Sequence, residues 1–88
     1  MGANGKQTVE LRFFASARAA MGTNDITVDL AGDSTIESVL GELTAPDDRL
    51  SAVLARCSFL VNGIATADRD HSLTDGDRVD VLPPFAGG

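Results

Sequence analysis

The residues best suited to chemistry are the last six of the sequence, residues 83–88 (PPFAGG). Glycine has no Cβ, so Gly87 and Gly88 can pass through a narrow tunnel in a partner protein. The two prolines before them stiffen the chain and project the last residues away from the fold. Transfer of AMP from ATP would turn the Gly88 carboxylate into a reactive acyl-adenylate, and a sulfur nucleophile could then displace AMP to leave a thiocarboxylate. The alternative interpretation is a frayed end without chemistry.

Other candidate groups are few. His71 is the only histidine and lies in a polar segment, residues 68–71, as is typical of a turn or solvent-exposed residue. Cys57 is the only cysteine, so an intramolecular disulfide is excluded, and no neighbouring base would activate its thiol. Because it falls on an apolar helical stripe, we expect a buried thiol. Ser16 and Ser58 lack a nucleophile motif. The sequence predicts no catalytic side-chain constellation and no metal site.

Size and charge limit the functional classes. A chain of 88 residues with 43% hydrophobic residues can form one small core. Its net charge of −6 would repel nucleic acid and suits a partner with a basic face, unless the charge only maintains solubility. No apolar run approaches the ~20 residues that span a bilayer, and residues 1–7 are polar rather than a secretory signal. We therefore expect no nucleic-acid or membrane partner and a cytoplasmic location.

Alternating apolar residues and turn signals predict the strands. Val9, Leu11 and Phe13 share one face of the first strand, which places Phe14 on the opposite face. A short Ala-rich helix at 15–21 should end at Gly22. Asn62-Gly63 predicts a hairpin, and Pro83 should end the last strand. The expected strands are residues 8–13, 26–30, 59–62, 64–67 and 79–81.

Two further helices are predicted in the middle of the chain. Residues 34–37 have the form of a capping box between Ser34 and Glu37. Pro46 suits the first turn of the next helix. Apolar stripes at helical spacing follow each start. These stripes are Ile36, Val39, Leu40 and Leu43, and then Leu50, Val53, Leu54 and Cys57.

The order of elements predicts an α+β fold with a single sheet, one face of which is covered by the helices. We expect a domain at residues 8–82, a flexible Gly-Gly tail at 83–88 and a disordered N-terminal extension at 1–7.

Several segments make the chain similar to the MoaD and ThiS superfamily of ubiquitin-like sulfur carriers, most of all to MoaD, the small subunit of molybdopterin synthase. The resemblance runs from about residue 8 to residue 88. It implies a β-grasp fold, a mixed sheet of about five strands with one face covered by short helices. The segments that carry it are residues 9–15 (VELRFFA), 19–22 (AAMG), 73–77 (LTDGD) and 82–88 (LPPFAGG).

The resemblance also implies a function. Gly88 would be adenylated by an E1-like, MoeB-like enzyme that consumes ATP, and then converted to a thiocarboxylate. The tail would enter the active site of the large, MoaE-like synthase subunit and pass sulfur to cyclic pyranopterin monophosphate. Catalytic side chains would belong to that subunit, and the small one would bind no cofactor. Gly87 and Gly88 match the family's Gly-Gly end, while Phe14, Leu82, Phe85 and Ala86 would contact partners.

Three other functions stay open. The chain could carry sulfur for the thiazole of thiamine or for cysteine synthesis, although its length and residues 13–15 (FFA) favour molybdopterin synthesis. It could be a ubiquitin-like modifier, since Gly-Gly activation also precedes isopeptide bonds to lysine. It could also be an interaction module with an inert tail.

Overall fold

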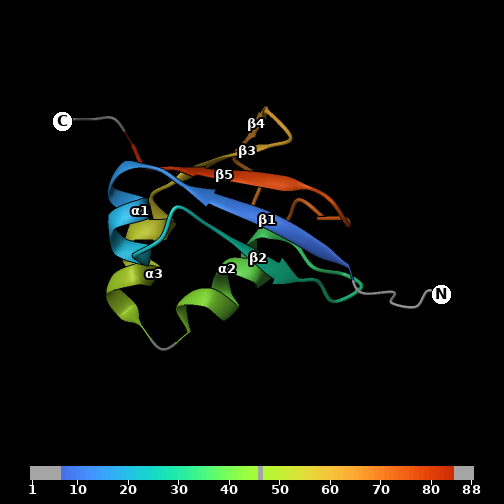
Figure 1. The fold of residues 1–88 in the computed structure, drawn as a ribbon, viewed down its shortest axis with the longest axis horizontal. Coiled ribbons are helices and arrows are strands. Elements are labelled where there is room, and N and C mark those ends of the chain that lie inside the picture. Colours follow the sequence, from blue (N-terminus) through green and yellow to red (C-terminus); the bar gives the residue numbers. More distant parts are fainter. Residues whose placement is uncertain (1–6, 46, 85–88) are drawn as a thin grey trace.

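Two parallel strands from opposite ends of the chain form the centre of a mixed sheet (Figure 1). The computed structural model describes residues 7–45 and 47–84. Its five strands lie in the order β2-β1-β5-β3-β4, and all neighbours other than β1 and β5 are antiparallel. The strands are β1 (Thr8–Phe13), β2 (Asp25–Asp29), β3 (Ser58–Val61), β4 (Ile64–Thr66) and β5 (Arg78–Leu82). Each lies within one residue of its expected bounds, so the predicted β-grasp arrangement is confirmed.

The turns follow the chemistry expected of their residues. Asn62 and Gly63 link β3 to β4 with φ values of 53° and 86°, the left-handed conformations that a tight two-residue hairpin requires. Strand β5 ends at Leu82, directly before Pro83. Both turn predictions are confirmed.

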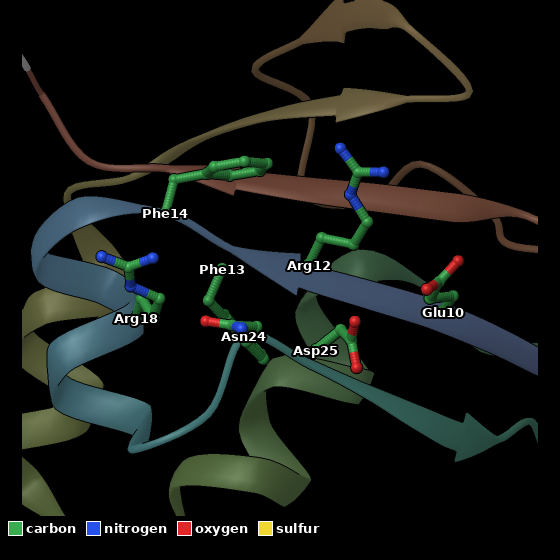
Figure 2. A pocket seen from close by; sticks show the side chains of 7 residues that line it. All are labelled: Glu10, Arg12, Phe13, Phe14, Arg18, Asn24 and Asp25. Atoms are coloured by element: carbon green, nitrogen blue, oxygen red, sulfur yellow. The ribbon is translucent and has the colours of Figure 1, made fainter.

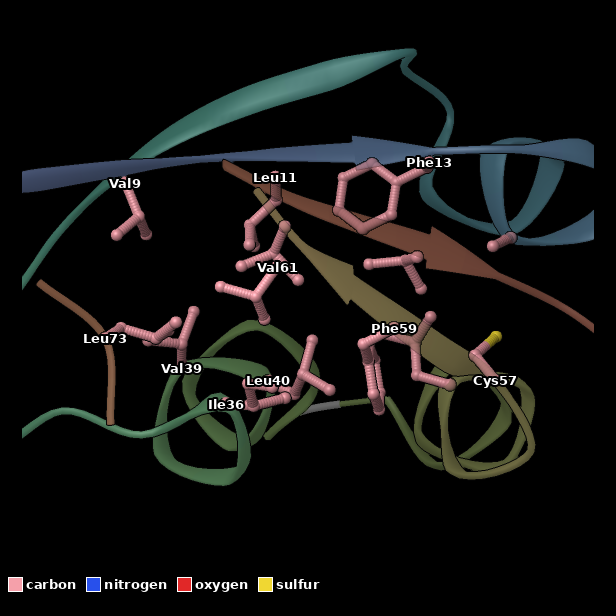
Figure 3. Packing of buried hydrophobic residues seen from close by; sticks show 14 residues of the cluster. Val9, Leu11, Phe13, Ile36, Val39, Leu40, Cys57, Phe59, Val61 and Leu73 are labelled. Carbon is pink, nitrogen blue, oxygen red and sulfur yellow. The ribbon is translucent and has the colours of Figure 1, made fainter. Parts of the chain in front are cut away.

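The core lies between the inner face of the sheet and the helices (Figure 3). Val9, Leu11 and Phe13 are each at most 2% exposed, as the alternation in β1 predicts. They pack with Phe59 from β3 and with the apolar stripe of the middle helix. Burial of this cluster supplies most of the free energy that holds the sheet to the helices. The buried members are Val9, Leu11, Phe13, Ala17, Ile36, Val39, Leu40, Leu54, Cys57, Phe59, Val61, Leu73, Val79 and Val81.

Three helices lie on one side of the sheet: α1 (Ala15–Met21), α2 (Ile36–Thr44) and α3 (Asp48–Ala55) (Figure 1). The capping box of α2 differs from the prediction. It joins Thr35 to Ser38, whose hydroxyls accept from each other's backbone N–H groups at 2.8 and 3.1 Å. The Ser34 hydroxyl instead bonds both backbone groups of Ala31, so it is not available to cap the helix.

The start and end of α3 also correct the sequence-based expectation. The helix begins at Asp48 with Asp47 as its cap, and Pro46 lies outside the described residues. It ends at Ala55, so Cys57 follows the helix instead of lying on its stripe. The prediction that Cys57 is buried is nevertheless confirmed, at 8% exposure.

Hydrogen bonds to Asp77 stabilise the turn that leads into β5. The Asp77 carboxylate accepts hydrogen bonds from the Thr74 backbone and from the Asn62 side chain, both at 2.9 Å. Desolvation by itself would raise the pKa of Asp77. Hydrogen bonds from Thr74 and Asn62, together with the nearby charge of His71, outweigh desolvation, so the pKa of Asp77 lies below its ordinary value. The ionised carboxylate therefore stabilises the folded state.

We expect Asp77→Ala to lower the free energy of unfolding by about 1–2 kcal/mol at pH 7, because several hydrogen bonds to a charged acceptor are lost. The folded-state pKa is lowered, so the contribution is fully present above the ordinary value of 3.8 and fades as the pH falls through the folded-state pKa. Urea titrations of both proteins between pH 3 and pH 7 would measure the difference. Asp33→Ala is the control, since the exposed Asp33 shows no side-chain bond within the described residues. A difference that grew on acidification would contradict the assignment.

Candidate functional site

An apolar groove lies where β5 leaves the sheet. Its volume is about 380 Å³. Parallel pairing brings the end of β1 beside the end of β5, and the Phe14 N–H donates to the Val81 carbonyl at 3.3 Å. The structure therefore brings together Phe14 and Leu82, two residues that the resemblance assigned to partner contacts. The groove is lined by Phe14, Ala15, Ser16, Leu82, Pro83 and Pro84.

Phe14 lies on the outer face of the sheet, which we define by Glu10, Arg12, Phe14, Arg78, Asp80 and Leu82. Its ring centroid is 5.5 Å from the guanidinium carbon of Arg12, on the face opposite Phe13. The side chain is half-buried and does not belong to the buried core cluster. The prediction that Phe14 lies on the face opposite Val9, Leu11 and Phe13 is confirmed, and its aromatic ring is available at the groove.

Ala15 makes the sharp turn from β1 into α1 and was not anticipated from the sequence. Its φ of 50° is in the left-handed region, which costs a residue with a Cβ roughly 1–2 kcal/mol. The turn lets the Phe14 carbonyl accept the N–H groups of both Ala17 and Arg18. Nothing in the sequence signals this conformation, since such a position usually holds glycine. The strained turn fixes the direction in which Phe14 leaves the sheet.

Two ion pairs between β1 and β5 lie on the outer face, beyond the groove. Arg12 Nε lies 3.1 Å from Asp80 Oδ1, and Arg78 Nε lies 3.3 Å from Glu10 Oε1. Beside the first pair is a second pocket of about 230 Å³ (Figure 2). The sequence analysis did not single out these charges, because alternation alone does not show which strands are neighbours. The second pocket is lined by Glu10, Arg12, Phe13, Phe14, Arg18, Asn24 and Asp25.

Cys57 and His71 lie outside the groove. Burial raises the pKa of the Cys57 thiol, and the charge of Arg69 only partly offsets this, so the thiol is a weak nucleophile. Its Sγ donates to the Val53 carbonyl at 3.4 Å. His71 lies in the loop before β5, where its backbone bonds Asp68 and Ile36. Within residues 7–45 and 47–84, no group of three or more metal-ligating side chains is found.

We expect Cys57→Ala and His71→Ala to keep the maximal rate of the sulfur transfer that the resemblance implies, since neither side chain lines the groove. Cys57→Ala should lower stability by about 1–2 kcal/mol through a small cavity. Thermal melts and a transfer assay on both variants would check this. A lost rate with an unchanged melt would assign chemistry to one of them.

Phe85, Ala86, Gly87 and Gly88 lie outside the described residues, so their predicted roles stay predictions. The structure brings the chain to their attachment point, Pro84, which is exposed at the edge of the groove. Among the described helices, none is long and apolar enough to cross a membrane.

Comparison with known proteins decides the family. The sequence matches the ThiS family over residues 11–88. The chain belongs to the ThiS family. It is 31% identical to the molybdopterin synthase sulfur carrier subunit of Chlamydomonas reinhardtii, over 91% of this chain and 98% of that protein. It is 37% identical to small archaeal modifier protein 3 of Haloferax volcanii, again over 91% of this chain and 98% of that protein.

A solved structure supports the same family. This is a complex of subunits 1 and 2 of the molybdopterin-converting factor from Helicobacter pylori, with a TM-score of 0.64 and 25% identity. The match covers 92% of this chain and 99% of that one. The ThiS-family chain described here is thus a ubiquitin-like protein of the MoaD and ThiS sulfur-carrier type, as the sequence resemblance indicated.

Proposed function

We propose that this protein is the sulfur carrier of molybdopterin synthesis and that Gly88 is its reacting residue. The observation that carries the proposal is the exit of β5 through Pro83 and the exposed Pro84, beside an apolar groove that Phe14 and Leu82 line. A tail that starts at an apolar docking surface can be inserted into a partner while the domain is held outside. The names of the Chlamydomonas and Helicobacter relatives support this pathway.

The proposed chemistry uses the terminal carboxylate. A carboxylate oxygen of Gly88 attacks the α-phosphorus of ATP in an E1-like, MoeB-like enzyme, and pyrophosphate leaves. A sulfur nucleophile at the oxidation level of sulfide then attacks the acyl carbon, the bond from that carbon to the AMP oxygen breaks, and the products are AMP and the Gly88 thiocarboxylate. The chain itself binds no cofactor in this scheme. Consumption of ATP fits a cytoplasmic location.

The proposed acceptor partner is a large, MoaE-like subunit of molybdopterin synthase. The tail, including Phe85, Ala86 and Gly87, enters its active site, where sulfur passes to cyclic pyranopterin monophosphate. In this proposal the catalytic side chains belong to that subunit. The position of the two candidate groups of this chain supports it, because Cys57 is buried and His71 lies in a loop away from the groove. The Helicobacter structure, a complex of two subunits, supports a partner of this kind.

A second function is favoured by the 37% identity to a small archaeal modifier protein. In that function an activated Gly88 would form isopeptide bonds to lysine side chains. A carrier for thiamine or cysteine synthesis would share the first two chemical steps and differ in the final acceptor.

Intact-mass analysis of the protein purified from its own host tests the proposal. We expect a species in which one terminal oxygen is replaced by sulfur, and we expect it to yield molybdopterin with the large subunit. A Gly88 deletion variant is the control and should lack that species. Covalent conjugates to host proteins without a thiocarboxylate would instead establish the modifier function.

A further inference from the structure

The Arg12 guanidinium is held between two neighbours on the outer face. Its Nε lies 3.1 Å from Asp80 Oδ1 on the adjacent strand β5. Its guanidinium carbon lies 5.5 Å from the centre of the Phe14 ring, close enough for a cation–π interaction. Figure 2 shows the Arg12 and Phe14 side chains on the same side of β1. Because both contacts fix its plane, Arg12 loses little freedom when it binds a further group.

The Asp80 carboxylate depends on Arg12 to balance its charge. Its Oδ1 is shielded from solvent and accepts no well-aligned hydrogen bond within the described residues, so the Arg12 ion pair is what balances its charge. The Asp80 side chain is only 15% exposed, whereas that of Arg12 is 38% exposed. Asp80 therefore serves to position Arg12, the more exposed member of the pair.

Arg12 borders the second pocket, which shares Phe14 with the apolar groove. Arg18 lines the same pocket from α1 and forms no ion pair with the described residues. We infer that Arg12 is a specificity-determining residue of the docking surface, and that the partner that accepts the tail places one carboxylate side chain in this pocket. This inference rests on the proposed function.

The other lining groups favour a single carboxylate over a phosphate. Glu10 and Asp25 also border the pocket and would repel a multiply charged anion. Glu10 is already paired with Arg78, which limits its effect on a singly charged group. A planar carboxylate can accept two parallel N–H bonds from a guanidinium, which gives orientation as well as attraction. The charge contact would thus fix the rotation of the domain about the docked Phe14.

The test compares two double variants by calorimetry against the large synthase subunit of the same organism. Arg12→Met with Asp80→Leu removes the pair without leaving a buried charge, and should weaken binding at least about tenfold. Glu37→Gln with Arg69→Met is the matched control, an ion pair that lines neither the apolar groove nor the second pocket. It should change the dissociation constant less than about threefold.

Further readouts separate the possible causes. Arg12→Lys keeps the charge beside Asp80 but loses the planar fork, so it should fold normally and still bind several-fold more weakly. Replacing acidic residues of the large subunit one at a time should find one whose effect on binding disappears in the variant with Arg12→Met and Asp80→Leu. Equal binding by wild type and the Arg12/Asp80 variant would overturn this inference alone. Failure of the wild type to bind would overturn the assigned partner as well.

Discussion

Deletion of Gly88 is expected to abolish sulfur transfer while the fold stays intact. The tail follows Pro84 after the last strand, and the core consists of residues between Val9 and Val81. Removing one residue draws the terminal carboxylate back by about 3.5 Å. Displacement of a reacting atom by about 1 Å can already cost on the order of 100-fold in rate, so the loss should exceed about 100-fold. Single-turnover formation of molybdopterin with the large subunit measures it.

The control for this deletion is a protein that lacks residues 1–6, which precede the described domain. It shortens the chain at the other end and should transfer sulfur at the wild-type rate. Melting curves of both truncated proteins should coincide with that of the full chain. If the protein without Gly88 still produced molybdopterin, the terminal carboxylate would not be the sulfur-carrying group.

The strands and the core could be predicted from the sequence because they depend on local patterns. The alternation of Val9, Leu11 and Phe13 specifies a face, and Asn62-Gly63 specifies a turn, with little influence from the rest of the chain. The order of strands in the sheet is not a local property. The resemblance implied only a mixed sheet of about five strands, which the structure confirms, and the order itself comes from the structure.

Other features depend on contacts that local patterns do not contain. The capping box moved to Thr35 and Ser38 because the Ser34 hydroxyl bonds Ala31 in the preceding turn. Ala15 adopts a strained φ because β1 must end at the groove and α1 must begin at once. In both cases the geometry of neighbouring elements determines the local structure, namely which residues cap α2 and which backbone conformation Ala15 adopts.

The pairing of Arg12 with Asp80 shows the same limit at the candidate site. These residues are far apart in sequence, and only the parallel register of β1 and β5 places them opposite each other. That register also joins Phe14 to the start of the tail. The proposed docking surface is therefore a consequence of the central strand pair, and either strand alone contains only half of it.

Phe14→Ala is expected to weaken association with the large subunit by ~2 kcal/mol, or roughly 30-fold in the dissociation constant. The ring is half-buried on the outer face and borders both the groove and the second pocket. An aromatic side chain at the centre of a docking surface buries a large area with few rotamers to restrict. The loss should appear mainly in the dissociation rate, because the variant keeps its charges and hence its rate of encounter. Calorimetry and stopped-flow kinetics would measure both quantities.

Ile64→Ala is the matched control for this variant. Ile64 is a large apolar residue, 72% exposed, on the edge strand β4, and it does not line the groove. Its replacement removes a comparable apolar surface and should leave the dissociation constant unchanged. Equal losses in the two variants would mean that the partner covers the sheet without using the groove as its anchor. An unchanged affinity for Phe14→Ala alone would mean that the ring does not contact the partner, and that the tail supplies most of the binding energy.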